Sequence, residues 1–133
     1  MDKEIIYKDL SYKINGLLFQ VHGKLGRYRN EKQCGDFFEQ LLKQNNIKYE
    51  REFQFFDPQY GAKNVRCIID FIIESKIIIE FKAKSFLTKE DYFQLQRYLT
   101  TLNFQLGILV NFRQPHLVPK RIINKYYIPK VNL

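Results

Sequence analysis

Two carboxylates and a lysine stand on apolar segments near the middle of the chain. Asp70 lies inside Val65–Ile73, and Glu80-Phe81-Lys82 follows directly on Ile77-Ile78-Ile79. Strand-like segments of this kind exclude charge, because a buried charge destabilises the fold unless it is paired or binds a metal. We therefore expect these three side chains to form a functional site.

The spacing of these residues indicates that their side chains meet. Side chains two apart on a strand share a face, so Glu80 and the lysine point the same way. A tight hairpin at Glu74-Ser75-Lys76 brings Asp70 beside them if Ile73 pairs with Ile77. This pairing needs a three-residue loop, or a bulge with the same effect, because a two-residue loop turns Asp70 to the other face.

This set of groups suits hydrolysis assisted by a divalent metal. Two neighbouring carboxylates repel each other, and a few oxygen ligands favour Mg²⁺ or Mn²⁺, which keep several waters and also bind phosphate. Such an ion activates water and positions a phosphodiester. Lys82 would stabilise charge on the phosphate or help to deprotonate the attacking water. The alternative is an ordinary ion pair between Glu80 and Lys82, or a strand end where both side chains reach solvent.

Three polar residues outside the strands could extend this site. Gln94 and Tyr98 are four apart on a predicted helix, so they share a face, which borders the apolar stripe of that helix. Glu31 begins another predicted helix, where an acid is favoured by the helix dipole and could also act as an upstream metal ligand. The alternative is a surface glutamine at position 94 and a partly buried tyrosine at position 98.

The elements that must position these residues follow from periodicity and turn signals. Helices are predicted over 4–23, 31–45 and 88–102, and strands over 48–56, 64–73, 76–84 and 104–112. Asn30 and Thr88 are predicted helix caps, and Asp57–Gly61 is a predicted turn. Three consecutive strands indicate an antiparallel meander, and the last helix then crosses to a further strand. The fold class is therefore α/β, a mixed sheet flanked by helices with an extra helix at the N-terminal end.

Length and charge narrow the class of partner. The 133 residues suffice for one domain, expected over 1–133, and the net charge of +8 favours nucleic acid. Basic residues gather around Tyr28 near the start of the second predicted helix: Lys24, Arg27, Arg29 and Lys32. Arginine with an aromatic ring suits a phosphate backbone with occasional base stacking, and a solvated loop is the alternative. The basic tail from Pro115 could bind nucleic acid, form a final strand or pack in a dimer.

Several other classes of function are disfavoured. Two cysteines without a CxxC motif indicate a reducing compartment, and two distant histidines show no zinc-ligand spacing. There is no signal-peptide pattern and no apolar stretch of about 20 residues, so we expect a cytoplasmic protein without membrane contact. The sequence holds no Ser-His-Asp or Cys-His arrangement, no P-loop and no dinucleotide fingerprint.

The motifs together resemble a known group. Asp70, Glu80-Phe81-Lys82 and Gln94-x-x-x-Tyr98, in this order of strands and helices, resemble the PD-(D/E)XK nuclease superfamily, and the last motif is similar to the QxxxY motif of its RecB-like branch. The chain also resembles the GxxExxY family. The segments that carry this second resemblance are Tyr7–Lys13, Val21–Gly26, Asp70, Glu80–Ala83, Gln94–Leu99, Gly107–Phe112 and Lys120–Ile122. The chain departs from the family at Tyr28 (glycine position), Cys34 (tyrosine position) and Ile69 (proline position), while Glu31 is retained.

The resemblance implies a restriction-endonuclease-like core of the order αβββαβ. It implies Asp70 and Glu80 as metal ligands, the backbone carbonyl of Phe81 as another and Glu31 as a fourth. Lys82 would be the catalytic lysine. The residues that the resemblance places near the scissile phosphate are Gln94 and Tyr98.

We therefore expect a nuclease that uses Mg²⁺ or Mn²⁺ to hydrolyse phosphodiester bonds in DNA. A non-catalytic module on the same fold, binding nucleic acid or a protein partner, is the alternative. A dimeric Holliday-junction-type resolvase is a third hypothesis, within the nuclease class. The sequence leaves open whether the chain acts alone, as a homodimer or in a larger complex.

Overall fold

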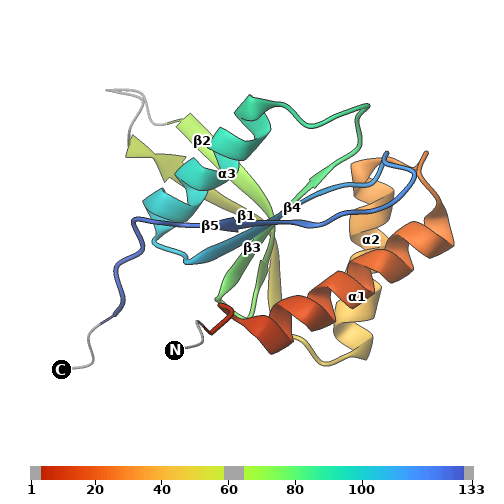
Figure 1. Ribbon diagram of the computed structural model, residues 1–133, viewed down its shortest axis with the longest axis horizontal. Coiled ribbons are helices and arrows are strands. Elements are labelled where there is room, and N and C mark those ends of the chain that lie inside the picture. The colour runs from red at the N-terminus through yellow and green to blue at the C-terminus, as the bar shows by residue number, and fades with distance from the viewer. Residues whose placement is uncertain (1–3, 59–64, 131–133) are drawn as a thin grey trace.

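The computed structural model describes residues 4–58 and 65–130, and within them three helices flank a five-stranded sheet (Figure 1). The elements are α1 (Lys8–Leu25), α2 (Glu31–Gln44), β1 (Tyr49–Asp57), β2 (Val65–Ile73), β3 (Ile77–Lys82), α3 (Lys89–Leu102), β4 (Leu106–Asn111) and β5 (Lys120–Ile123). The α/β class and the mixed sheet are as predicted. None of the helices in the described ranges combines the length and the apolar character needed to cross a bilayer.

The order of strands across the sheet is β1-β2-β3-β4-β5. The first three strands are antiparallel neighbours, and α3 then crosses over so that β4 runs parallel to β3. The predicted meander and crossover are therefore confirmed. The C-terminal tail, for which three roles were open, contributes β5, which pairs antiparallel with β4.

Local signals fix the ends of the helices. Asn30 caps α2, since its side chain accepts a hydrogen bond from the Gln33 N–H over 2.8 Å. Before α3, the Thr88 N–H donates to Asp91 Oδ2 over 2.8 Å. The first helix begins later than predicted because Tyr7 has a left-handed backbone (φ 50°), which a right-handed helix does not continue through. The predicted turn over 57–61 lies mostly outside the described residues.

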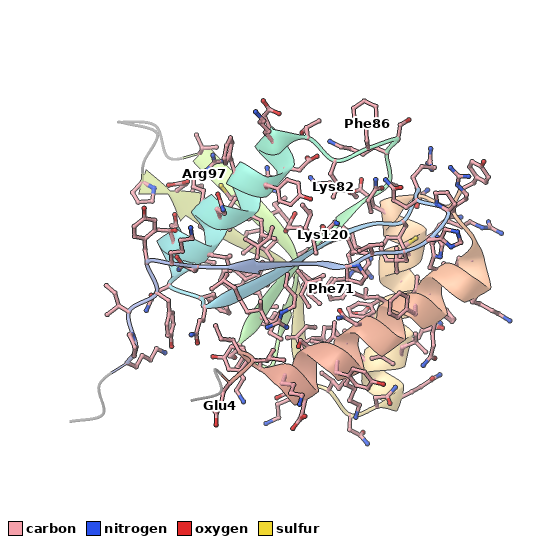
Figure 2. All side chains as sticks on the ribbon, in the orientation of Figure 1. Glu4, Phe71, Lys82, Phe86, Arg97 and Lys120 are labelled. Atoms are coloured by element: carbon pink, nitrogen blue, oxygen red, sulfur yellow. The ribbon has the colours of Figure 1, made fainter. Side chains whose placement is uncertain are left out.

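The sheet separates two apolar cores. One lies between the sheet and α1 and α2, and the other between the sheet and α3. On β3, Ile79 and Phe81 pack into the first core and Ile78 into the second. Glu80 and Lys82 thus lie on the α3 face, because residues two apart on a strand share a face. Figure 2 shows Lys82 on this side of the sheet and Phe71 on the other side, toward α1.

Aromatic packing anchors the end of β3. The ring centre of Phe81 lies 5.4 Å from that of Phe38, 5.3 Å from that of Phe71 and 4.7 Å from that of Phe112. Tilted and edge-on ring pairs of this kind add about 0.5–1.5 kcal/mol each beyond their burial. They fix the backbone on both sides of Phe81, where the two charged residues of β3 stand.

β1 and β2 change faces at one point along their length. In β2, Ile69 packs into the α3 core and Phe71 into the α1/α2 core, although residues two apart on a regular strand share a face. In β1, Phe53 likewise packs on the α3 side, and Tyr49 on the other side. The switch in β2 therefore falls at Asp70.

Glu52 stands opposite Asp70 at this switch. The β1–β2 pairs on either side are Arg51↔Phe71 and Phe53↔Ile69. The register of the β1–β2 pairs is the same before and after the switch, so the change of face takes place at one residue in each strand. Glu52 does so with a left-handed backbone (φ 54°), which is uncommon for a residue other than glycine.

Candidate functional site

The β2–β3 hairpin has the register predicted from the sequence. Its pairs run from Ile73↔Ile77 to Phe71↔Ile79. The turn is tight, because Glu74 and the serine that follows it both have a left-handed backbone. Beyond the last pair the strands separate, since β2 stays paired with β1 while β3 continues beside β4. The next residues, at the fork between the strands, are Asp70 and Glu80.

The two carboxylates bridge this fork. The Asp70 N–H donates to Glu80 Oε1 over 3.1 Å, and the Phe81 N–H donates to Asp70 Oδ2 over 2.7 Å. These bonds replace the backbone ladder and use one oxygen of each carboxylate. Because the N–H and C=O of a strand residue point to the same side, the Phe81 carbonyl also points into the fork.

Burial opposes ionisation of this pair. Glu80 is 5% exposed, and Asp70 is partly buried. Burial raises the pKa of Asp70. The hydrogen bond from the Phe81 N–H lowers this pKa, and the charge of Glu31 raises it again. Burial also raises the pKa of Glu80, and the neighbouring charge of Asp70 raises it further. Burial at the fork therefore opposes the joint ionisation of the two carboxylates, and a nearby cation would favour it.

The donor set at the fork fits Mg²⁺ or Mn²⁺. Two carboxylates and a carbonyl are hard oxygen donors, and these ions complete their coordination with water and phosphate. Among the described residues no group of three or more histidine, cysteine, aspartate or glutamate side chains is placed to hold a metal together. An ion at the fork would therefore take only part of its coordination from side chains.

Lys82 is held by α3 rather than by Glu80. Its Nζ lies 3.5 Å from Gln94 Oε1 and 3.8 Å from Asp91 Oδ1. Lys84 Nζ also reaches Asp91, with 2.6 Å to Oδ2. Burial opposes ionisation of Asp91, but hydrogen bonds from Lys84 and Thr88 keep the pKa of Asp91 below its ordinary value.

Asp91 is a site residue that the sequence analysis missed. In the sequence it stands three residues after Thr88, the predicted cap of the helix, and its Oδ2 accepts from the Thr88 N–H, as expected at that position. Its second role, as the ionic partner of Lys82, depends on where α3 lies over the sheet. The sequence offered no signal for that contact.

Gln94 and Tyr98 face the sheet from α3. Gln94 accepts from Lys82, as described above, and Tyr98 is buried one helical turn further along. The Tyr98 ring packs edge-on against Phe55, with ring centres 5.3 Å apart. Burial, and then the charge of Glu80, raise the pKa of the Tyr98 phenol. Four of the five predicted catalytic residues, Glu80, Lys82, Gln94 and Tyr98, therefore lie on the α3 side of the sheet. The fifth, Asp70, stands at the fork, where its N–H donates to Glu80.

A pocket of about 240 Å³ opens on the α2 side of the same fork. Its lining comes from α2, β1, β2 and β3: Glu31, Lys32, Gly35, Arg51, Glu52, Asp70, Phe71 and Phe81. Glu31, which was the fourth predicted ligand, thus shares a pocket with Asp70. Glu52 and Arg51 were not predicted, because a regular alternation assigns Glu52 to an outward face and carries no mark of the switch.

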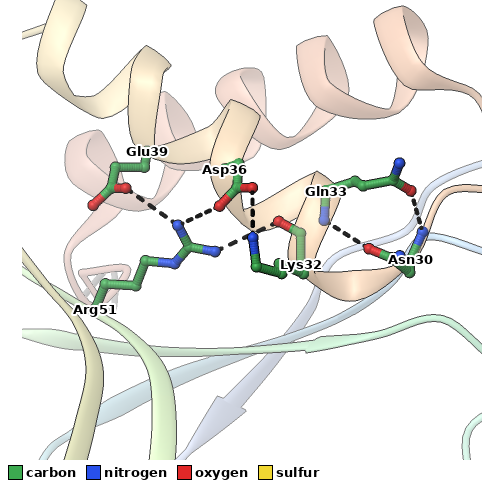
Figure 3. A network of polar contacts seen from close by, with 6 residues as sticks. All are labelled: Asn30, Lys32, Gln33, Asp36, Glu39 and Arg51. Atoms are coloured by element: carbon green, nitrogen blue, oxygen red, sulfur yellow. Dashed lines mark hydrogen bonds and ion pairs between the residues drawn. The ribbon is translucent and has the colours of Figure 1, made fainter.

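Arg51 fastens the start of α2 to β1, as Figure 3 shows. Its Nη1 lies 2.7 Å from Asp36 Oδ1 and 3.2 Å from Glu39 Oε1, and its Nη2 donates to the Lys32 carbonyl over 3.5 Å. Gly35 leaves room for this side chain, since a Cβ there would lie 2.6 Å from Arg51 Nη2. This network holds the helix turn that carries Glu31 against the sheet.

The predicted nucleic-acid-binding residues lie around the loop between α1 and α2. In order along the chain they are Lys24, Arg27, Arg29 and Lys32. Arg27 is the most constrained, because its Nε donates to the Arg113 carbonyl over 2.9 Å. Lys32 is exposed and pairs with Asp36 over 3.4 Å.

Comparison with known proteins gives a family and a similar solved structure. The sequence model of a family described as the PD-(D/E)XK nuclease superfamily matches residues 8–123. The crystal structure of the protein SSO0001 is similar with a TM-score of 0.55 and 22% identity, over 93% of this chain and 69% of that one. At this identity the second match shows a shared fold. No curated protein matches the chain.

Proposed function

Because the chain belongs to the PD-(D/E)XK nuclease superfamily, we propose that it is a divalent-metal-dependent nuclease that hydrolyses phosphodiester bonds in DNA. Nucleases of this superfamily generally use divalent metals. The observation that carries the proposal is the pair of the partly buried Asp70 and the buried Glu80 at the fork, with Lys82 on the strand face of Glu80. The net charge of +8 supports a polyanionic substrate.

In this proposal Asp70, Glu80 and the Phe81 carbonyl would hold Mg²⁺ or Mn²⁺, and Glu31 would act from across the pocket. When bound, the ion lowers the pKa of a water molecule and offsets the charge of the phosphate. The raised pKa of both carboxylates supports this assignment, because a bound cation would stabilise the charged forms that burial disfavours.

The chain's own groups supply the rest of the chemistry. The ammonium of Lys82 would stabilise charge that develops on the phosphate, and Asp91 and Gln94 fix its position. Gln94 and Tyr98 would orient the scissile phosphate from the α3 side. The orientation of these groups before the substrate arrives reduces the entropy lost in the reaction.

A cleavage assay with four proteins tests the proposal. Wild type, Asp70→Asn, Lys82→Ala and the control Glu50→Gln, which changes an exposed carboxylate of β1, are incubated with single-stranded, duplex and branched DNA in Mg²⁺ or Mn²⁺. We expect each site substitution to lower the cleavage rate by about 10²–10⁴-fold. Glu50→Gln should cleave as wild type does. Cleavage that survives Asp70→Asn unchanged would contradict the proposal.

Within the superfamily, we place the chain with the RecB-like branch on its Gln94-x-x-x-Tyr98 motif, and next to the GxxExxY family on Glu31. The altered positions, Tyr28 and Cys34, favour a second candidate function, a module that binds DNA without cleaving it. Binding that weakens with salt, is unaffected by Asp70→Asn and occurs without cleavage of any substrate would support that candidate.

A further inference from the structure

Tyr28 presents an aromatic ring to solvent between two arginines. It lies in the loop between α1 and α2 and is 75% exposed. The guanidinium carbon of Arg27 lies 5.1 Å from the ring centre, and that of Arg113 lies 5.7 Å from it. Isolated exposed aromatics are common on proteins. A ring flanked by two guanidiniums from distant parts of the chain is a more specific arrangement.

The loop that carries this ring is locked in place. Arg27 Nε donates to the Arg113 carbonyl over 2.9 Å, and Arg113 Nε donates to the Arg27 carbonyl over 2.9 Å. On either side of the ring, Gly26 ends α1 and the Asn30 capping box begins α2. The backbone that carries the ring is thus held in place before any ligand arrives, which lowers the entropic cost of binding.

The ring lies at the same end of the sheet as the fork. In Figure 1 the loop between α1 and α2 and the loop after β4 run together beyond the right-hand end of the sheet. Asn111 ends β4 opposite Lys82, and its side chain accepts from the Arg113 N–H over 3.2 Å. On the other side, Glu31 follows Tyr28 by three residues and lines the pocket with Asp70.

The chemistry of this cluster selects an unpaired nucleobase. An aromatic ring stacks on any base, and a guanidinium nearby adds cation–π and phosphate contacts. The two hydrogen bonds between Arg27 and Arg113 use only the Nε atom of each side chain, so the Nη ends of both guanidiniums can face a phosphate. Inside a continuous duplex the faces of the bases are covered by neighbouring bases, and only the terminal pairs expose a face. An unpaired base can therefore lie on Tyr28 where a base within a duplex cannot.

We propose that Tyr28, flanked by Arg27 and Arg113, stacks on an unpaired base next to the cleavage site. The inference rests on the proposed nuclease function and adds the class of substrate. That substrate is DNA with a single-stranded or splayed segment rather than a continuous duplex.

Binding measured without cleavage tests this inference. Fluorescence anisotropy with EDTA would follow a labelled single-stranded oligonucleotide of mixed sequence and a blunt duplex of the same length. The variants are Tyr28→Ala, Tyr28→Phe, which keeps the ring, and the control Tyr12→Ala, which removes a ring that is 81% exposed on α1. Thermal melts of each protein show that the fold is intact.

We expect Tyr28→Ala to weaken single-strand binding by about tenfold or more and duplex binding by less than about twofold. Tyr28→Phe and Tyr12→Ala should bind as wild type does. The inference is overturned if Tyr28→Ala has no effect, if it weakens both ligands equally, or if Tyr12→Ala has the same effect. Failure of the nuclease proposal shows separately, as absence of cleavage by a wild-type protein whose binding still depends on Tyr28.

Discussion

The two halves of the β2–β3 hairpin differ in what holds their strands together. In the half next to the turn, isoleucines pair across a regular backbone ladder, and both faces are buried. In the other half, the strands have parted, and the Asp70 and Glu80 side chains bond to the backbone instead. The same hairpin therefore provides a stable anchor at one end and a charged, open fork at the other.

This difference shows how the fold accommodates a site that is unfavourable by itself. The fork places two carboxylates where burial opposes their charge. The paired half, the Phe81 cluster and the Arg51 network hold the surrounding backbone in place. Substitutions in the two halves should accordingly have opposite effects on stability and function.

The largest effect on stability is expected in the paired half. Ile78 is fully buried between β2, β4 and α3. Ile78→Ala should lower the free energy of unfolding by about 2–5 kcal/mol, because it leaves a cavity in the α3 core. Urea unfolding followed by circular dichroism measures this change. Metal binding per folded molecule should be unaffected by Ile78→Ala. If the control Glu50→Gln lowered the free energy of unfolding by a comparable amount, the comparison between the halves would be wrong.

A smaller effect is expected beside the fork, at Gly35. An added Cβ at Gly35 would push against the end of the Arg51 side chain and weaken its contacts with its acidic partners. Gly35→Ala should therefore leave the protein less stable than the helix substitution Gly16→Ala does, by about 1–2 kcal/mol in the free energy of unfolding. Gly16→Ala is the matched control, since a Cβ at Gly16 of α1 meets nothing within 4 Å. That control should be neutral or should stabilise the helix by less than about 1 kcal/mol. Equal effects of the two substitutions on the free energy of unfolding would show that the Arg51 contacts do not stabilise the fold beside the fork.

The smallest effect is expected in the pH dependence of stability. The folded state raises the pKa of both fork carboxylates, so their stabilising contribution is complete below about pH 4 and is lost as the pH rises through the raised values. Asp70→Asn removes one of the charges and can still accept from the Phe81 N–H. Without metal, this variant should gain about 1 kcal/mol over wild type at pH 8 and much less at pH 5. Urea unfolding at both pH values measures the difference, and the opposite pH trend would contradict the account.

Much of this arrangement could be predicted from the sequence, because charge on an apolar strand is conspicuous. Asp70, Glu80 and Lys82 stand out for this reason, and the turn at Glu74 fixes their register. The face switch at Glu52 could not be predicted, since alternation along a strand carries no mark of where it breaks.

The contacts that depend on tertiary packing could not be predicted from the sequence either. Asp91 stands three residues after the predicted cap of the helix, and only the placement of α3 gives it Lys82 as a partner. Arg113 stands 86 positions from Arg27, with no local pattern to join them. The early start predicted for α1 failed because the backbone of Tyr7 could not be inferred from its residue type.

The central claim is that the fork between β2 and β3 binds a divalent cation. Calorimetric titration of Mn²⁺ into wild type and into Asp70→Asn at pH 8 tests it most directly, with Glu50→Gln as the control. The account predicts binding by wild type and by Glu50→Gln, and a loss of at least about tenfold in affinity for Asp70→Asn. Equal binding by wild type and Asp70→Asn, or no binding by any of the three proteins, would contradict it.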